Sequence, residues 1–188
     1  PRLEELYSPV LSKYEPQILF EDFIRSEGLD VLPHSPRPPL TILSHFYSIQ
    51  ESFKLLYNSD KKYDFVIKSR FDLGQINRNS SPNSVECINF HTNKVNKEKL
   101  NMAWWPDRWM LTEGPPDMRF YSSMETMKPF SRIYEHIKNY MKKDSSCREE
   151  VKGRLGEQNI CNASVLYKKF LEDNNLWGNR NAIICEKN

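Results

Sequence analysis

The chain has 188 residues, of which 38% are hydrophobic and 28% charged, a composition that fits one folded domain and does not suggest disorder. Its net charge of +2, with acids and bases mixed along the chain, argues against a dedicated nucleic-acid binder, which would concentrate basic residues on one face. No apolar run approaches the roughly 20 residues of a membrane-spanning helix. We expect a single domain over residues 1–188, and the missing initiator methionine is consistent with a trimmed N-terminus.

Helical periodicity begins at Leu3–Tyr14, and Pro16–Phe23 is a candidate short strand. Four prolines within residues 32–40 predict an extended loop. From Thr41 to Tyr57, apolar residues recur at spacings of four, three, four and three, which predicts an amphipathic helix that begins at Thr41 and buries one stripe. The polar run at 58–62 ends this helix.

The segment Tyr63–Arg70 has consecutive apolar residues at 65–67 and predicts an interior strand buried on both faces. Residues 74–89 are rich in Asn and Ser and predict a loop, and short strands are expected at 85–90 and 102–105. A helical region is expected from Pro116, with Pro129 splitting it into two helices.

A further amphipathic helix is expected around Val165–Leu171, and a last strand at 181–186. Because helices and strands alternate, the pattern predicts an α/β layered fold.

Charged residues gather at the carboxyl end of the strand predicted at Tyr63–Arg70. Because side chains alternate faces along a strand, Lys68, Arg70 and Asp72 would share one face there, where ligands bind in open α/β sheets. A guanidinium donates paired hydrogen bonds to phosphate, and a carboxylate supplies oxygen ligands for magnesium or manganese. The spacing therefore suits a metal-bound diphosphate, while a simple ion pair between Arg70 and Asp72 remains the alternative.

The run from Ser44 to Leu73 resembles a group of small glycosyltransferases with the GT-A fold, found in bacterial polysaccharide clusters and large DNA viruses. Their pattern is a Ser-x-x-Tyr-Ser-Ile-like helix, then a strand ending in Arg-x-Arg-x-Asp. The matching residues are Ser44, Tyr47, Ser48 and Ile49 on the helix, and Tyr63, Asp64, Arg70 and Asp72 on the strand. Lys68 stands where the first arginine is usual, which keeps the positive charge.

Two later segments resemble the same family. Asp107 matches the aspartate of an Asp-Gln-Trp/Phe segment, in which Arg108 replaces the usual glutamine. Residues 118–122 match a Met-x-x-Tyr-Ser helix, and Glu157 takes the place of the glutamate in a Glu-x-x-Leu-x-x-(Tyr/His)-Leu segment.

The resemblance implies a GT-A-like (Rossmann-like) layered fold with a central mixed, mostly parallel sheet flanked by helices. It implies a hexosyl- or pentosyltransferase that moves a sugar from a nucleotide-diphosphate donor to a hydroxyl of a glycan acceptor. Asp72 would hold a manganese or magnesium ion that acts as a Lewis acid on the leaving diphosphate, and Lys68 and Arg70 would add positive charge. Asp107 and Glu157 are the expected catalytic carboxylates, toward the donor sugar and the acceptor hydroxyl.

Other interpretations stay open. Asp107 also fits a helix cap in a tryptophan-rich core, and Glu157 fits a first-turn glutamate that stabilises a helix dipole. The departures at Lys68 and Arg108, and the absence of an evident first strand for the nucleotide base, keep open a non-catalytic domain that binds a glycan or a nucleotide. We expect a cytoplasmic location, in a bacterium or a virus-infected cell; a secretory lumen is the alternative and would permit one disulfide, between Cys147 and Cys161.

Overall fold

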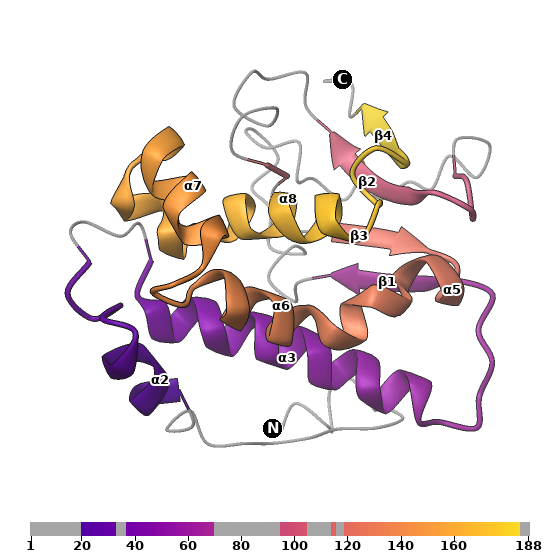
Figure 1. Cartoon of the computed structure of the whole chain (residues 1–188). Coiled ribbons are helices and arrows are strands. Elements are labelled where there is room, and N and C mark those ends of the chain that lie inside the picture. The colour runs from indigo at the N-terminus through magenta and orange to yellow at the C-terminus, as the bar shows by residue number, and fades with distance from the viewer. Residues whose placement is uncertain (1–19, 33–36, 70–94, 105–113, 116–118, 185–188) are drawn as a thin grey trace, which may run out of the picture. The chain divides into compact units, whose positions relative to one another are not determined.

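In the described residues two helices come first, then three short strands, then a series of helices and finally one more strand (Figure 1). The computed structural model describes residues 20–32, 37–69, 95–104, 114–115 and 119–184. The chain divides into two compact units, one from Pro1–Lys62 with Phe130–Asn162 and the other from Tyr63–Pro129 with Ala163–Asn188. The expectation of a single domain stays a prediction. No helix in the described ranges is long and apolar enough to cross a membrane.

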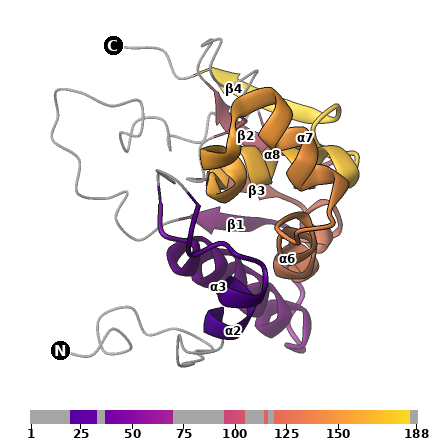
Figure 2. The same ribbon diagram turned by 60° about the vertical axis from the view of Figure 1, so that its left-hand side comes forward.

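The first unit is helical in the part that the structure describes. Its elements are α2 (Glu21–Ser26), α3 (Pro39–Tyr57), α6 (Ile133–Tyr140), α7 (Ser146–Leu155) and the 3-10 helix η6 (Glu157–Cys161), with most of the 3-10 helix η5 (Lys128–Arg132) before α6. The views in Figures 1 and 2 show α3 and α6 packed side by side. The expected strand at Pro16–Phe23 is wrong in its described part, because Glu21–Phe23 belongs to α2.

The long helix α3 confirms the periodicity of its sequence. Of the five residues in the predicted stripe, Ile42, Phe46, Ile49 and Phe53 are buried, and Leu56 in the last turn is half-buried. The helix begins at Pro39 and not at Thr41, because the fixed φ of proline suits the first turn and its missing N–H has no partner to lose there.

A buried glutamine joins α3 to α6. Gln50 is 1% exposed, and its Oε1 accepts hydrogen bonds from the backbone N–H groups of Tyr134 (3.0 Å) and Glu135 (3.4 Å), in the first turn of α6. Its Nε2 donates to the Glu135 carboxylate at 2.8 Å. The Gln50 side chain therefore acts as an N-cap for α6. It accepts hydrogen bonds from backbone N–H groups that have no partner within that helix.

The end of this unit's helical region matches the sequence only in part. Pro129 does separate two helices, since it lies in the 3-10 turn η5 between α5 (Met124–Met127) and α6. The helix α7 has no counterpart among the predicted elements; Gly156, with φ of +88°, ends it. Cys147 and Cys161 are both buried thiols, so no disulfide joins them.

The second unit contains a small mixed sheet. Its strands are β1 (Val66–Ser69), β2 (Leu100–Trp104), β3 (Arg119–Ser122) and β4 (Arg180–Ile184), in the spatial order β1-β3-β2-β4 (Figure 1). The pairs β1–β3 and β2–β3 are antiparallel, and β2–β4 is parallel. An α/β chain with a mixed sheet is confirmed, but the expectation of a mostly parallel sheet is wrong for these strands.

The strands at 102–105 and 181–186 are confirmed by β2 and β4, each shifted by one or two residues. The Met-x-x-Tyr-Ser helix expected at 118–122 is wrong, because Arg119–Ser122 forms β3. Aromatic residues at 120 and 121 favour a strand, and pairing with both β1 and β2 supplies partners for the backbone.

The burial expected on both faces of β1 is also wrong. Within the described sheet β1 pairs with β3 alone, and Ile67 is 45% exposed. The consecutive apolar residues are therefore not buried on both faces.

A buried asparagine holds one end of the sheet together. Asn101 is 0% exposed, and its Nδ2 donates to the carbonyl oxygens of Asn96, Lys99 and Tyr121 at 2.7 to 3.0 Å. Its Oδ1 accepts from the backbone N–H of Asn96 at 3.0 Å and from Asn181 Nδ2 at 2.7 Å. One side chain thus joins the turn before β2 to β3 and β4, and its own polar atoms are satisfied.

Helix α8 (Ala163–Asp173) packs on this sheet. Tyr167, which is fully buried, has its ring centroid 5.1 Å from that of Phe120 on β3. Gly114 approaches the same helix so closely that a methyl group on it would lie 2.7 Å from Lys168 Cβ and overlap the Ser164 carbonyl. The helix predicted around Val165–Leu171 is confirmed, and it covers one face of β3.

Candidate functional site

The candidate site is the carboxyl end of β1, where the chain leaves Ser69 toward Arg70 and Asp72. Arg70, Asp72 and Asp107 lie outside the residues that the structure describes, so their predicted roles stay predictions. Lys68 and Glu157 are described, and they belong to different units of the chain. The described part of the site therefore consists of β1 and its neighbours β3 and α8.

Lys68 lies inside the layer between the sheet and α8. It is 7% exposed, and it stands opposite Phe120 in the register of β1 and β3, so both side chains point to the same face. Its Nζ lies 5.6 Å from the ring centroid of Phe120 and 5.3 Å from that of Tyr167. Both rings present negative faces to the ammonium, which offsets part of the cost of burying its charge.

A second buried cation lies at the next position in the register. Arg119, the first residue of β3, stands opposite Ser69 and is 9% exposed. Its Nε donates to Ser69 Oγ at 3.5 Å, a long and weak hydrogen bond. Burial lowers the pKa of Arg119, and its interaction with Tyr121 partly opposes that shift.

Tyr121 completes this face of the strand pair. It follows Arg119 by two residues, so the two side chains share a face, and it is 6% exposed. Burial raises the pKa of its phenol, and the positive charge of Arg119 partly opposes the shift. Near neutral pH the phenol is therefore uncharged and provides no counter-charge for Arg119.

The end of β1 thus carries positive charge on both faces, Lys68 on one and Arg119 on the other. These residues suit an anion such as a phosphate and do not suit a metal ion, which needs carboxylate, histidine or thiolate ligands. Among the described residues, no group of three or more His, Cys, Asp or Glu could hold a metal ion. Metal binding at this site would rest on Asp72 with partners from outside the described ranges.

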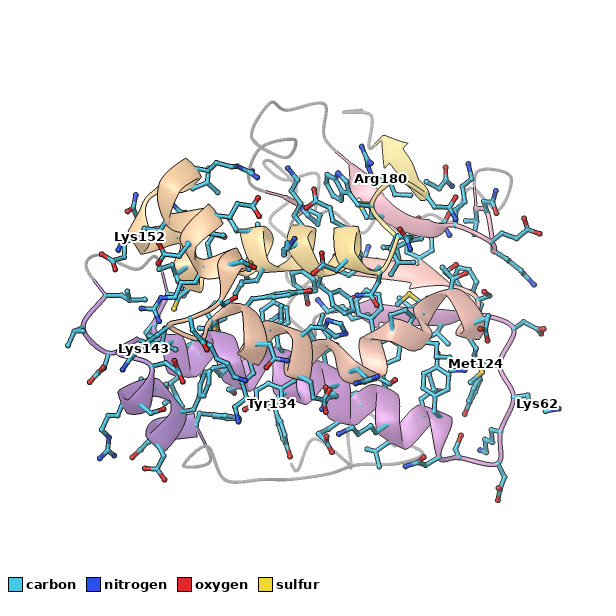
Figure 3. The ribbon with its side chains drawn as sticks, viewed as in Figure 1. Lys62, Met124, Tyr134, Lys143, Lys152 and Arg180 are labelled. Atoms are coloured by element: carbon cyan, nitrogen blue, oxygen red, sulfur yellow. The ribbon has the colours of Figure 1, made fainter. Side chains whose placement is uncertain are left out.

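Glu157 begins η6, directly after Gly156. Its Oε1 lies 3.8 Å from Nζ of Lys152 on α7, and both side chains are partly exposed (Figure 3 labels Lys152). An ion pair of this kind stabilises little, because water screens it. The first-turn position is the one expected for a glutamate that stabilises a helix N-terminus, and the carboxylate is also accessible to a ligand.

The motif residues of α3 have local roles in the first unit. Ser48 Oγ donates to the Ser44 carbonyl oxygen at 2.8 Å within the helix. Tyr47 packs edge-on against Phe20 and Tyr134, with ring centroids 5.5 and 5.2 Å away (Figure 3 labels Tyr134). These residues contribute helix geometry and aromatic packing.

Sequence reasoning missed Arg119 and Ser69 as site residues. A cation at the head of the aromatic run Phe120–Tyr121 is a weak signal, and only the register of β1 and β3 places it beside the end of β1. The chain matches no protein-family model, no curated protein and no solved structure. The resemblance to glycosyltransferases therefore rests on the motif residues named above.

Proposed function

We propose that this chain is a metal-assisted glycosyltransferase with a GT-A-like fold, which moves a sugar from a nucleotide-diphosphate donor to a hydroxyl of a glycan acceptor. The observation that supports it most is the end of β1, where two buried cations, Lys68 and Arg119, flank the point at which the chain continues into Arg70 and Asp72. Positive charge fixed in a poorly hydrated place stabilises a diphosphate best as its charge grows during bond cleavage.

Each residue in the proposal has a defined part. Arg70 donates hydrogen bonds to the diphosphate, and Lys68 adds positive charge from behind the strand. Asp72 binds manganese or magnesium, which on binding supplies a Lewis acid at the leaving group. Asp107 and Glu157 are the carboxylates proposed to orient the donor sugar and to accept the proton of the acceptor hydroxyl.

The test is to incubate the protein with a panel of nucleotide sugars and manganese and to measure release of the nucleoside diphosphate, with and without glycan acceptors. We expect release from one donor, and a rate at least about 100-fold lower in Asp72→Asn, because a fixed electrostatic partner of the leaving group is lost. Asp60→Asn is the matched control: it makes the same chemical change at an exposed carboxylate in the turn after α3, and the rate should not change. No release from any donor would contradict the proposal.

A non-catalytic domain that binds a glycan or a nucleotide is the second candidate. The observation in its favour is that Glu157, one of the two proposed catalytic carboxylates, already has a cationic neighbour in Lys152. Binding of a nucleotide sugar or a free glycan in a thermal shift assay, without release of nucleoside diphosphate, would favour this candidate.

A further inference from the structure

Arg119 is a buried cation with few partners. It is 9% exposed, and in the part of the chain that the structure describes its only hydrogen bond is the one of 3.5 Å to Ser69 Oγ. No described carboxylate lies within ion-pair distance of its guanidinium. Its neighbour Tyr121 is an uncharged phenol near neutral pH.

A guanidinium has five N–H donors, and removing it from water without partners is costly. Native proteins satisfy buried arginines with carboxylates, carbonyl oxygens or bound anions. Arg148 in the other unit shows the usual solution: its Nη1 donates to the carbonyl oxygens of Glu27 at 2.8 Å and Met141 at 3.2 Å. Arg119 has no such arrangement among the described residues, and the buried polar atoms there that have no partner belong to Glu135 and Arg180, so the Nη donors of Arg119 reach the surface and are available to a ligand.

We propose that Arg119 binds a phosphate-class anion at the carboxyl end of β1, together with the hydroxyl of Ser69. Because Arg119 and Ser69 are paired in register, both lie on the same face of the β1–β3 pair, directly before Arg70. A forked guanidinium matches two phosphate oxygens at once, which a lysine does not. The assignment of this anion as the diphosphate of a nucleotide sugar rests on the proposed function, whereas the anion site itself rests on the geometry of Arg119.

The experiment compares thermal unfolding of the wild type, Arg119→Met and Arg148→Met, alone and with inorganic phosphate, pyrophosphate or a set of nucleoside diphosphates. For the wild type, a diphosphate at about 100 times its Kd should raise the Tm by roughly 5–10 °C. Arg119→Met should lose this shift. Without an anion its Tm should equal or exceed that of the wild type, because a largely buried guanidinium with a single weak hydrogen bond is replaced by an apolar side chain of similar length.

Arg148→Met is the matched control, since it removes a guanidinium whose partners are already present. Its Tm should fall, because the two carbonyl oxygens lose a donor, while its response to pyrophosphate should persist. If Arg119→Met fails to fold, Arg119→Lys keeps the charge and should bind pyrophosphate at least about 10-fold more weakly, since paired hydrogen bonds are lost. A second measurement follows the Arg119 Nε–Hε resonance by NMR, which should shift during titration with pyrophosphate.

Several results would overturn the inference: no anion shifts the wild-type Tm, the Arg119 variants bind pyrophosphate as well as the wild type does, or Arg119→Met without an anion is less stable than the wild type. Equal affinity for inorganic phosphate and for every diphosphate would overturn the diphosphate assignment. The proposed function can fail separately. Anion binding at Arg119 without sugar release contradicts the transferase, whereas sugar release with an unchanged donor KM in Arg119→Lys contradicts the Arg119 site.

Discussion

The ammonium nitrogen of Lys68 lies 5.3 Å from the ring centroid of Tyr167, so a strand residue expected at a ligand-binding end of the sheet is covered by α8. The contact places a positive charge behind the end of β1, within the packed layer of its unit. At this depth the charge acts at a distance and without screening by water, which suits the electrostatic part proposed for Lys68.

The first prediction concerns this lysine. Lys68→Met should be the more stable of two variants, because its thioether keeps the contacts with the rings of Phe120 and Tyr167. Lys68→Gln should be about 1–3 kcal/mol less stable, because it buries an amide where two aromatic rings face it. Urea unfolding checks the order of the two variants, and a Gln variant as stable as the Met variant would contradict it.

Asn101 should be among the least replaceable residues of the sheet. Asn101→Ala removes the hydrogen bonds that join the turn before β2 to the strands β3 and β4. We therefore expect the free energy of unfolding to fall by about 3–5 kcal/mol. The control Asn139→Ala changes an exposed helical position and should leave stability within about 0.5 kcal/mol. Chemical unfolding of both variants measures the difference, and similar stabilities would contradict the role of Asn101.

Gly114 should tolerate no side chain. Its φ of +112° is unfavourable for other residues, and a Cβ would overlap the Ser164 carbonyl on α8. We expect Gly114→Ala to destabilise the protein by about 2–4 kcal/mol. Gly153→Ala is the opposite case: Gly153 lies within α7, where a methyl group would meet nothing within 4 Å beyond its own helix, and the change should stabilise by about 0.5–1 kcal/mol. The Tm values of the two variants should therefore move in opposite directions.

Substitution of Glu157 distinguishes a catalytic role of this carboxylate from a structural one. If it is the proposed base, Glu157→Gln should lower the rate of sugar transfer by about 10²–10⁴-fold while the Tm stays nearly unchanged. Glu150→Gln is matched to it, since Glu150 also forms an exposed ion pair on α7, with Arg154 at 2.9 Å, and it should change neither quantity. A normal transfer rate in Glu157→Gln would exclude Glu157 as the base.

The alkaline stability of the protein should depend on Tyr134. Burial, and then the negative charge of Glu135, raise its pKa above the usual value of 10.0. The stability linked to this shift is complete below the unfolded pKa of about 10 and is lost as the pH rises through the folded value, because only the unfolded state has released its proton there. Tyr134→Phe should therefore show a shallower loss of stability above pH ~10, measured by urea unfolding at several pH values. An unchanged pH dependence would contradict the shift.

Local periodicity predicted the long helix well, because the stripe of Ile42, Phe46, Ile49 and Phe53 records directly which side of α3 is buried. Local sequence patterns gave the wrong secondary structure at two other segments. The segment with Glu21–Phe23 is predicted as a strand but forms a helix, and the motif that contains Phe120–Tyr121 predicts a helix where the structure has a strand.

The candidate site was predicted in part. The sequence indicates that a cation, Lys68, stands near the ligand-binding end of β1, but it does not indicate that Lys68 is buried or that Ile67 on the other face is exposed. It did not indicate Arg119, because residues 69 and 119 are far apart in the chain and their pairing depends on β3 lying antiparallel to β1. Strand register of this kind is set by long-range packing.

By itself, then, the sequence determined the helices with strong periodicity, α3 and α8, and the approximate places of the strands β2 and β4, since each depends on residues close by in the chain. Only the tertiary structure decided the strand order β1-β3-β2-β4, the burial of Lys68 beneath α8 and the position of Arg119 opposite Ser69. The physical reason is that hydrogen-bond pairing and desolvation join residues distant in the chain, and no local pattern encodes which distant partner a strand or a charge will meet.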